Sequence, residues 1–248
     1  MPFTDTMLQD QFTLAVEWVA DRVLGALTGA GDVDLSVSAG IGGNPDGPGS
    51  VATAAALRIV GSDLFAPSLF TGTPLPARTA TALVEAEERF GAFEAPGQDT
   101  DRLVVGWRDW AAAELLARAG QNVRVRRPEA VLPTPDRPSG SSEWQPWSVS
   151  MSQLACLALP GLDSPLHEQA RRAPLALARG ATRSLLRRDH RTAARLARWL
   201  AWVQASGTPV PIEVAPVLRH IAQVGDGGAR TALDLEIARR LLAGEPSR

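Results

Sequence analysis

Apolar residues near the start of the chain recur at intervals of three and four residues, which is the spacing of one face of an α-helix. The pattern predicts a helix that begins near Thr4 or Asp5, whose side chains can cap it, and that runs to about Leu27. Gly29 and Gly31 then end the helix. Its apolar face consists of Phe12, Val16, Val19, Val23 and Leu27.

The segments that follow are shorter and less regular. Residues 33–39 alternate apolar and polar side chains and are predicted to form a strand, and residues 40–49 form a loop rich in glycine and proline. In residues 51–64 the alanines favour a helix and the branched side chains favour a strand, so both interpretations stay open. Pro76 is well placed as the first residue of another helix, which ends at residue 90 or 93.

Residues 101–127 give the most complete local pattern. An apolar strand over 103–105, a helix over 110–119 and a second strand over 123–125 are predicted, and such crossovers normally join parallel strands. The layout resembles half of a Rossmann-type dinucleotide-binding fold. Only Gly106 of its glycine fingerprint is present, so the unit is either structural or a modified site for a nucleotide or another anion.

The rest of the chain divides into a linker and a helical part. Prolines and serines are frequent in residues 128–150, which predicts a linker or a long irregular loop. We therefore predict an α+β or α/β fold with a mixed region at 1–127 that holds a small parallel sheet, the linker at 128–150, and an all-helical bundle at 151–248. The expected helices of the bundle are 151–159, 165–177, 181–188, 190–205, 211–224 and 229–242.

Composition excludes several kinds of chemistry. The only cysteine is Cys156, so an intramolecular disulfide is excluded, and the absence of lysine excludes Schiff-base catalysis and a P-loop. The three histidines stand far apart without metal-binding spacing, and we predict no metal site and no cofactor. The N-terminus lacks a signal-peptide pattern and no window resembles a membrane span, so we expect a cytoplasmic protein without membrane contact.

Positive charge is concentrated in one part of the chain whose total formal charge is only −2. Residues 166–205 contain nine arginines and two acids, so this segment carries +7 and the remainder carries −9. The charged side chains form either a solvated helix face or a site for phosphate, sulfate or carboxylate, which guanidinium groups bind bidentately. The arginines at four-residue spacing are Arg179, Arg183, Arg187, Arg191 and Arg195, and we take Arg183, Arg187, Arg191 and the more distant Arg108 as candidate anion ligands.

Two other segments are candidate ligand contacts. The loop at 40–49 can bind an anion through backbone N–H groups, or it is an ordinary surface loop. Trp144 and Trp147 lie in the proline-rich segment, where two large rings either anchor the chain or cover a pocket. The loop residues we single out are Gly40, Gly42, Gly43 and Asn44.

These residues lead to two hypotheses about function. The first is an enzyme, or a subunit of one, that acts on a small anionic molecule in a setting such as bacterial specialised biosynthesis, with His190, Asp109 or Glu114 transferring protons. The second is a non-catalytic protein whose basic helical part binds a partner protein, with a nucleic acid as the weaker version because the total charge is not basic. A homo-oligomer is compatible with both.

Overall fold

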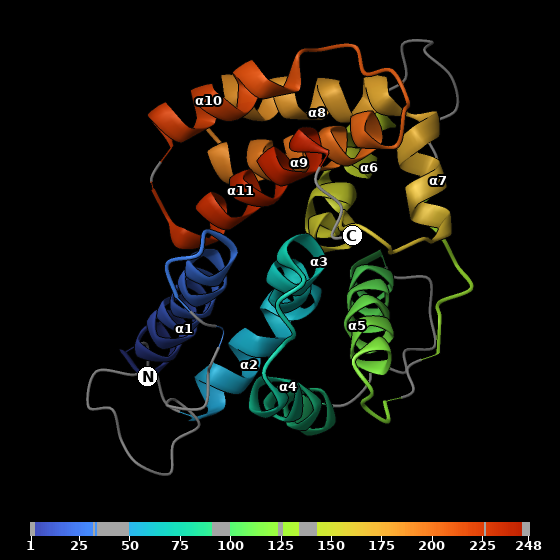
Figure 1. Cartoon of the computed structure of the whole chain (residues 1–248). Helices are drawn as coiled ribbons and strands as arrows, with labels where there is room; N and C mark the ends of the chain where they lie inside the picture. The colour runs from blue at the N-terminus through green and yellow to red at the C-terminus, as the bar shows by residue number, and fades with distance from the viewer. Residues whose placement is uncertain are drawn as a thin grey trace.

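The computed structural model describes residues 3–31, 33, 50–90, 100–123, 126–133, 143–225 and 227–244, and every regular element within these ranges is a helix (Figure 1). The α-helices are α1 (Phe3–Leu27), α2 (Ser50–Val60), α3 (Ala66–Thr71), α4 (Ala77–Phe90), α5 (Thr100–Arg118), α6 (Trp144–Gln153), α7 (Pro165–Arg172), α8 (Pro174–Leu186), α9 (His190–Ala205), α10 (Val214–Val224) and α11 (Ala229–Ala243). Two short 3₁₀ helices, η2 (Gly61–Phe65) and η3 (Ala155–Leu157), continue α2 and α6.

The predicted parallel sheet is wrong for the residues that the structure describes. Residues 103–105 lie inside α5, which is continuous from Thr100 to Arg118, so no strand–helix–strand unit forms and the Rossmann-type resemblance falls with it. Val104, Trp107 and Ala111 are buried on one side of α5 at helical spacing. Tertiary packing of this face therefore overrides the strand preference of two adjacent valines. Val123 lies outside any regular element, and residues 124 and 125 lie outside the described part of the chain.

Two of the helices predicted in the N-terminal part of the chain are confirmed. The helices predicted from Thr4 or Asp5 to Leu27 and from Pro76 to residue 90 are confirmed as α1 and α4. The ambiguous residues 51–64 are helical, as α2 followed by η2. Of the strand predicted at 33–39, the structure describes only Val33, which is buried and whose carbonyl oxygen accepts a hydrogen bond of 2.6 Å from the Thr79 hydroxyl.

The predicted linker is only partly irregular. Residues 126–133 have no regular structure, but the Trp107 indole donates to the Ala130 carbonyl at 3.0 Å and the Gln169 amide donates to the Leu132 carbonyl at 2.6 Å. From Trp144 onward the chain is α6, so an irregular segment running to residue 150 is wrong. Pro146 is compatible with α6 because the first turn of a helix needs no backbone donor there.

The C-terminal part is helical, as predicted, with some boundaries displaced. The prediction for 190–205 matches α9, whereas 165–177 is divided at Ala173 into α7 and α8. Pro174 starts α8 because its ring cannot continue the preceding helix. Gly180, which falls between the predicted helices 165–177 and 181–188, lies in the middle of α8.

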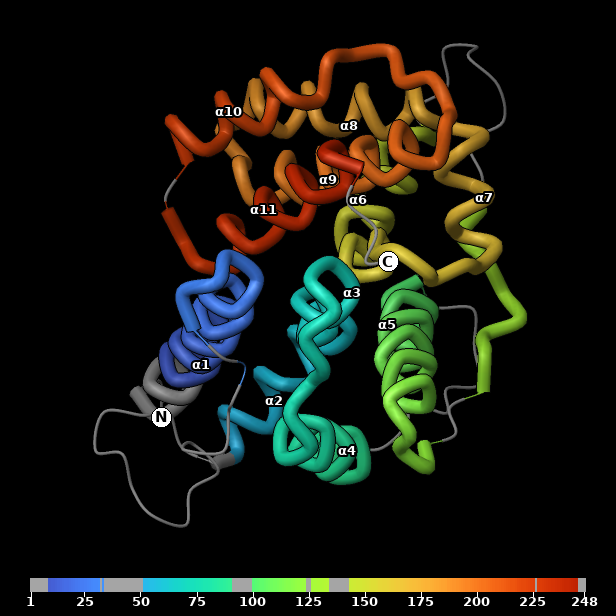
Figure 2. The backbone as a smooth tube through the Cα atoms, viewed as in Figure 1, coloured from blue at the N-terminus to red at the C-terminus, as the bar shows by residue number. Residues whose placement is uncertain are grey.

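Figure 2 shows α1–α5 in one layer and the remaining helices in a second layer above it. α9 is the centre of the second layer and packs against α6, α8, α10 and α11. Buried apolar side chains from both layers form one continuous cluster. The two layers are therefore joined by a shared core, which α1 extends by packing along α11.

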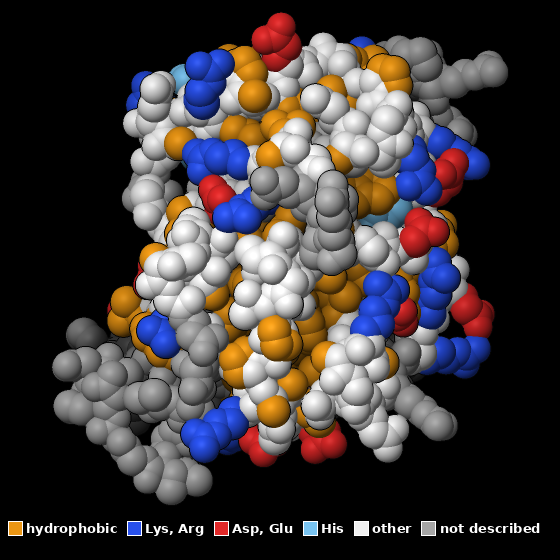
Figure 3. Space-filling view, viewed as in Figure 1, with side chains coloured by type: hydrophobic (Ala, Val, Ile, Leu, Met, Phe, Trp, Pro, Cys, Tyr) orange, Lys and Arg blue, Asp and Glu red, His pale blue; other side chains and the backbone are white. Residues whose placement is uncertain are grey.

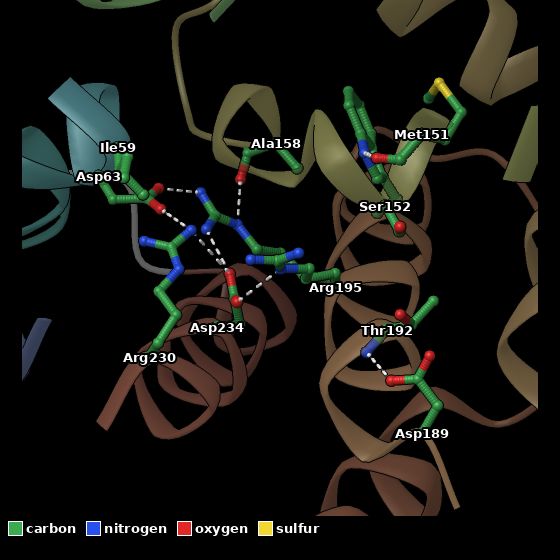
Figure 4. Close-up of polar contacts among 12 residues, drawn as sticks. Ile59, Asp63, Met151, Ser152, Ala158, Asp189, Thr192, Arg195, Arg230 and Asp234 are labelled. Carbon is green, nitrogen blue, oxygen red and sulfur yellow. Dashed lines mark hydrogen bonds and ion pairs between the residues drawn. The ribbon is translucent and has the colours of Figure 1, made fainter. Parts of the chain in front are cut away.

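A buried group of charged side chains lies inside this shared core (Figure 4). Arg198 on α9 is fully buried, and its guanidinium donates to Asp63 of η2 at 2.6 Å and to Asp234 of α11 at 2.9 Å. Its Nε donates to the Ala158 carbonyl at 3.2 Å. Arg230 pairs with the other oxygen of Asp63, also at 2.6 Å. We call Arg198, Arg230, Asp63 and Asp234 the buried ion cluster.

The cluster keeps the Asp63 carboxylate ionised inside the protein. Burial alone would raise the pKa of Asp63, but the adjacent Arg198 and Arg230 outweigh that effect and hold it at about 2. Within the cluster each of the two arginines pairs with both aspartates. Arg195 adds a more distant cation, 3.7 Å from Asp234.

We expect Asp234→Asn to destabilise the fold by about 3–5 kcal/mol, because removing one partner leaves buried cationic charge uncompensated. Urea unfolding followed by circular dichroism measures the change. Glu129→Gln is the matched control, since the Arg126–Glu129 pair is almost fully exposed and its loss should leave the midpoint unchanged. Equal effects of the two substitutions would contradict a structural role for the cluster.

Candidate functional site

An open groove on the helical layer is the candidate site. It has a volume of about 510 Å³ and lies between the start of α6, the outer side of α8 and the segment that precedes α10. Most of its surface is apolar. Its lining consists of Trp144, Gln145, Leu175, Ala178, Arg179, Thr182, Arg183, Leu186, Pro211 and Ile212. We call it the α6–α8 groove.

A close helix crossing determines the shape of the groove. A Cβ atom added to Gly180 of α8 would lie 2.7 Å from the Ser148 Cβ of α6 and 3.0 Å from a methyl group of Leu196 on α9. Only glycine lets the two helices approach this closely. Trp144 lies one turn before Ser148, so the crossing also places this ring against the groove.

The groove exposes both apolar and cationic groups. Leu186 is 82% exposed and Leu175 is 40% exposed, whereas leucines elsewhere in α8 and α9 are largely buried. Within the described part of the chain, Arg179 and Arg183 have neither an ion pair nor a hydrogen bond through their guanidinium groups. An apolar surface bordered by unpaired charges of one sign is typical of a binding site.

The structure brings some of the predicted ligand residues together and separates others. Trp144, predicted to anchor the chain or to cover a pocket, and Arg183, a candidate anion ligand, line the same groove. Trp147 is buried in the core, and its indole nitrogen has no hydrogen-bond partner among the described residues. Arg187 and Arg191 are exposed but do not line the groove.

The remaining candidates of the anion site lie elsewhere. The Arg108 guanidinium donates a hydrogen bond to the Ile59 carbonyl, which connects α5 to α2. Gly40, Gly42, Gly43 and Asn44 lie outside the described residues.

The three predicted catalytic residues have separate surroundings. Asp109 is buried and pairs with Arg58 at 2.6 Å, and Glu114 pairs with Arg118 on the surface of the same helix. His190 is the first residue of α9, after the helix cap at Asp189. None of the three lines the α6–α8 groove.

Glu87 belongs to the same group as Asp109 and Arg58. Burial raises the pKa of Glu87 to about 7, the negative charge of Asp109 adds to the increase, and Arg58 at 3.5 Å opposes it. Arg58 on α2 thus pairs with Glu87 on α4 and Asp109 on α5, which connects the three helices. Sequence spacing did not indicate this group, because its members are far apart along the chain.

Ser164 and His167 have the geometry of a hydroxyl–imidazole pair, but they are buried. His167 Nε2 donates to the Leu157 carbonyl at 2.9 Å, which leaves Nδ1 to accept from the Ser164 hydroxyl at 2.8 Å. The ring also packs against Trp199 and Trp202, with centroids 5.3 and 4.6 Å away. Burial lowers the pKa of His167 to about 4, so the imidazole is neutral and structural at physiological pH.

A second cavity of about 300 Å³ lies where the two layers meet, on the face where Figure 3 shows apolar side chains gathered between charged ones. Phe70, Trp202 and Leu241 are among the residues that line it. Its one arginine, Arg240, already pairs with Glu236 and donates to the Leu27 carbonyl at 2.7 Å. This cavity therefore offers less free charge than the α6–α8 groove.

The described ranges contain neither a cluster of metal ligands nor a membrane-spanning helix. Within them no group of three His, Cys, Asp or Glu side chains is arranged to hold a metal ion. No helix there is long and apolar enough to cross a membrane.

Comparison with known proteins gives no relative for this chain. No protein-family model, no curated sequence and no solved structure matches it. The function is therefore inferred from the chemistry of the described residues alone.

We expect Gly180→Ala to destabilise the fold by about 1–3 kcal/mol, because the new methyl group overlaps Ser148. Chemical denaturation measures this, and adding Ser148→Gly to the variant should restore part of the loss. Gly25→Ala in α1 is the matched control, since nothing lies within 4 Å of an added Cβ there and the helix should gain stability. A Gly180→Ala protein as stable as wild type would contradict the close crossing.

We expect His167 to make the fold sensitive to acid. Between pH 6.5 and about 4, His167 is protonated in the unfolded chain but neutral in the folded protein. As the pH is lowered through this range, the free energy of unfolding therefore decreases by about 3 kcal/mol because of this group. Urea unfolding of wild type and His167→Gln across this range isolates the effect, because the opposite contribution of Glu87 cancels in the difference. A difference that does not change with pH would contradict the assignment.

Proposed function

We propose that this protein is a non-catalytic interaction protein whose helical layer binds an acidic, partly apolar segment of a partner protein in the α6–α8 groove. The observation that carries the proposal is the exposure of Leu186 beside Arg179 and Arg183, which lack counter-ions in the described part of the chain. Leaving a leucine in water costs free energy, and a partner that covers it recovers that cost. The two arginines select a partner of negative charge.

The lining of the groove favours binding over catalysis. It contains no histidine, cysteine or carboxylate among the described residues, so it offers no general base and no activated nucleophile. Arginines that converge on a histidine or carboxylate would support the enzyme hypothesis. The groove instead combines arginines with leucine, proline, isoleucine and tryptophan, the mixture common in protein interfaces.

The test is selection of a displayed library of random peptides on the purified full chain. We expect enriched peptides that bind wild type at least about tenfold more tightly than a variant with Arg179→Glu and Leu186→Gln, because one substitution reverses the charge and the other removes apolar area. Titration calorimetry measures the affinities. Thermal melting checks that both proteins are folded.

A matched variant separates the groove from general surface effects. Arg187→Glu with Leu14→Gln makes the same chemical changes at an exposed arginine and at a leucine that is 66% exposed, both outside the groove. This variant should bind the selected peptides as wild type does. Failure to enrich any peptide, or equal loss of binding in both variants, would overturn the proposal.

A further inference from the structure

The shape of the groove defines what kind of segment it can bind, an inference that rests on the proposed function. One side of the groove is a single ridge along α8, with residues at spacings of three and four. The ridge extends over three helical turns, about 16 Å. In order, it consists of Leu175, Ala178, Arg179, Thr182, Arg183 and Leu186.

The opposite side is formed by short segments. Trp144 and Gln145 come from the first turn of α6, and Pro211 and Ile212 precede α10. The groove is open along its length, and its end leucines are the most exposed apolar groups of α8. An open trough with apolar ends suits an elongated occupant that lies along α8 better than a small molecule, which pockets normally enclose.

The charges in the trough indicate how the acids of the occupant are spaced. Arg179 and Arg183 are four residues apart on one helix, so they lie about 6 Å apart along its axis. Two carboxylates one turn apart on a second helix have the same spacing. A nucleic acid would satisfy the arginines but would leave Leu175 and Leu186 in water.

We infer that the groove binds an amphipathic helix of about three turns from a partner protein, with two carboxylates one turn apart on its apolar face. Apolar residues on either side of the acids contact Leu175 and Leu186. The acids pair with Arg179 and Arg183. Trp144 and Ile212 cover the flanks of the bound helix.

The experiment uses synthetic peptides of about 14 residues that are long enough to form the helix. The test peptide carries two glutamates one turn apart with leucines on both sides of the same face. A second peptide has the same composition with the glutamates moved to the opposite face, and a third has a central proline that breaks the helix. Fluorescence anisotropy of dye-labelled peptides measures binding to the full chain.

We expect the test peptide to bind about tenfold more tightly than the other two, and salt to weaken its binding. Arg179→Ala with Arg183→Ala should remove the advantage of the correctly placed acids, whereas Arg187→Ala with Arg191→Ala should not. Circular dichroism should show that the test peptide gains helix on binding.

Four results would overturn the inference. Equal binding of the three peptides, or loss of binding in both double variants, would mean that acid spacing and helix are not recognised. Selected peptides that need the groove but are neither acidic nor helical would leave the proposed function intact and reject this partner. Self-association of the chain, seen by light scattering and abolished by Arg179→Glu, would identify a second copy as the occupant instead.

Discussion

The position of Arg198 is the constraint on which the rest of the structure depends. A fully buried guanidinium is tolerated only when its donors meet acceptors, and here they reach two carboxylates and a backbone carbonyl. Apolar side chains can pack in several relative positions of two helical layers, whereas these hydrogen bonds and ion pairs form only at one relative position. α9 is thereby held against η2, α11 and η3 at once.

The same residue type has opposite roles on neighbouring helices. On α9 an arginine is enclosed and neutralised by aspartates. On α8 Arg179 is exposed and Arg183 is half-buried, and neither has a counter-ion in the described part of the chain. α8 packs on α9 and is crossed closely by α6 at Gly180, so the free charges stand on a fixed support. A binding surface on rigid helices loses little conformational entropy when it is occupied.

The spacing of apolar residues predicted individual helices correctly, but it did not predict contacts between residues that are far apart in the sequence. The apolar spacing before Leu27 gave α1 correctly, and the segment 190–205 gave α9. Two adjacent valines in α5 favoured a strand because the packing partners of that face are not visible in sequence. Arg198 was indistinguishable from the other arginines for the same reason, since its partner Asp63 is 135 residues away. Trp144 and Arg183 were both singled out, but that they share one groove required the fold.

The long separation of Asp63 from Arg198, Arg230 and Asp234 affects how the chain acquires its structure during synthesis. When η2 leaves the ribosome, its aspartate must stay hydrated until α9 and α11 have also emerged. The shared core between the two layers is therefore complete only when α9 and α11 are present. Until then the nascent chain exposes apolar surface that is buried in the folded protein, because contacts between distant segments form late.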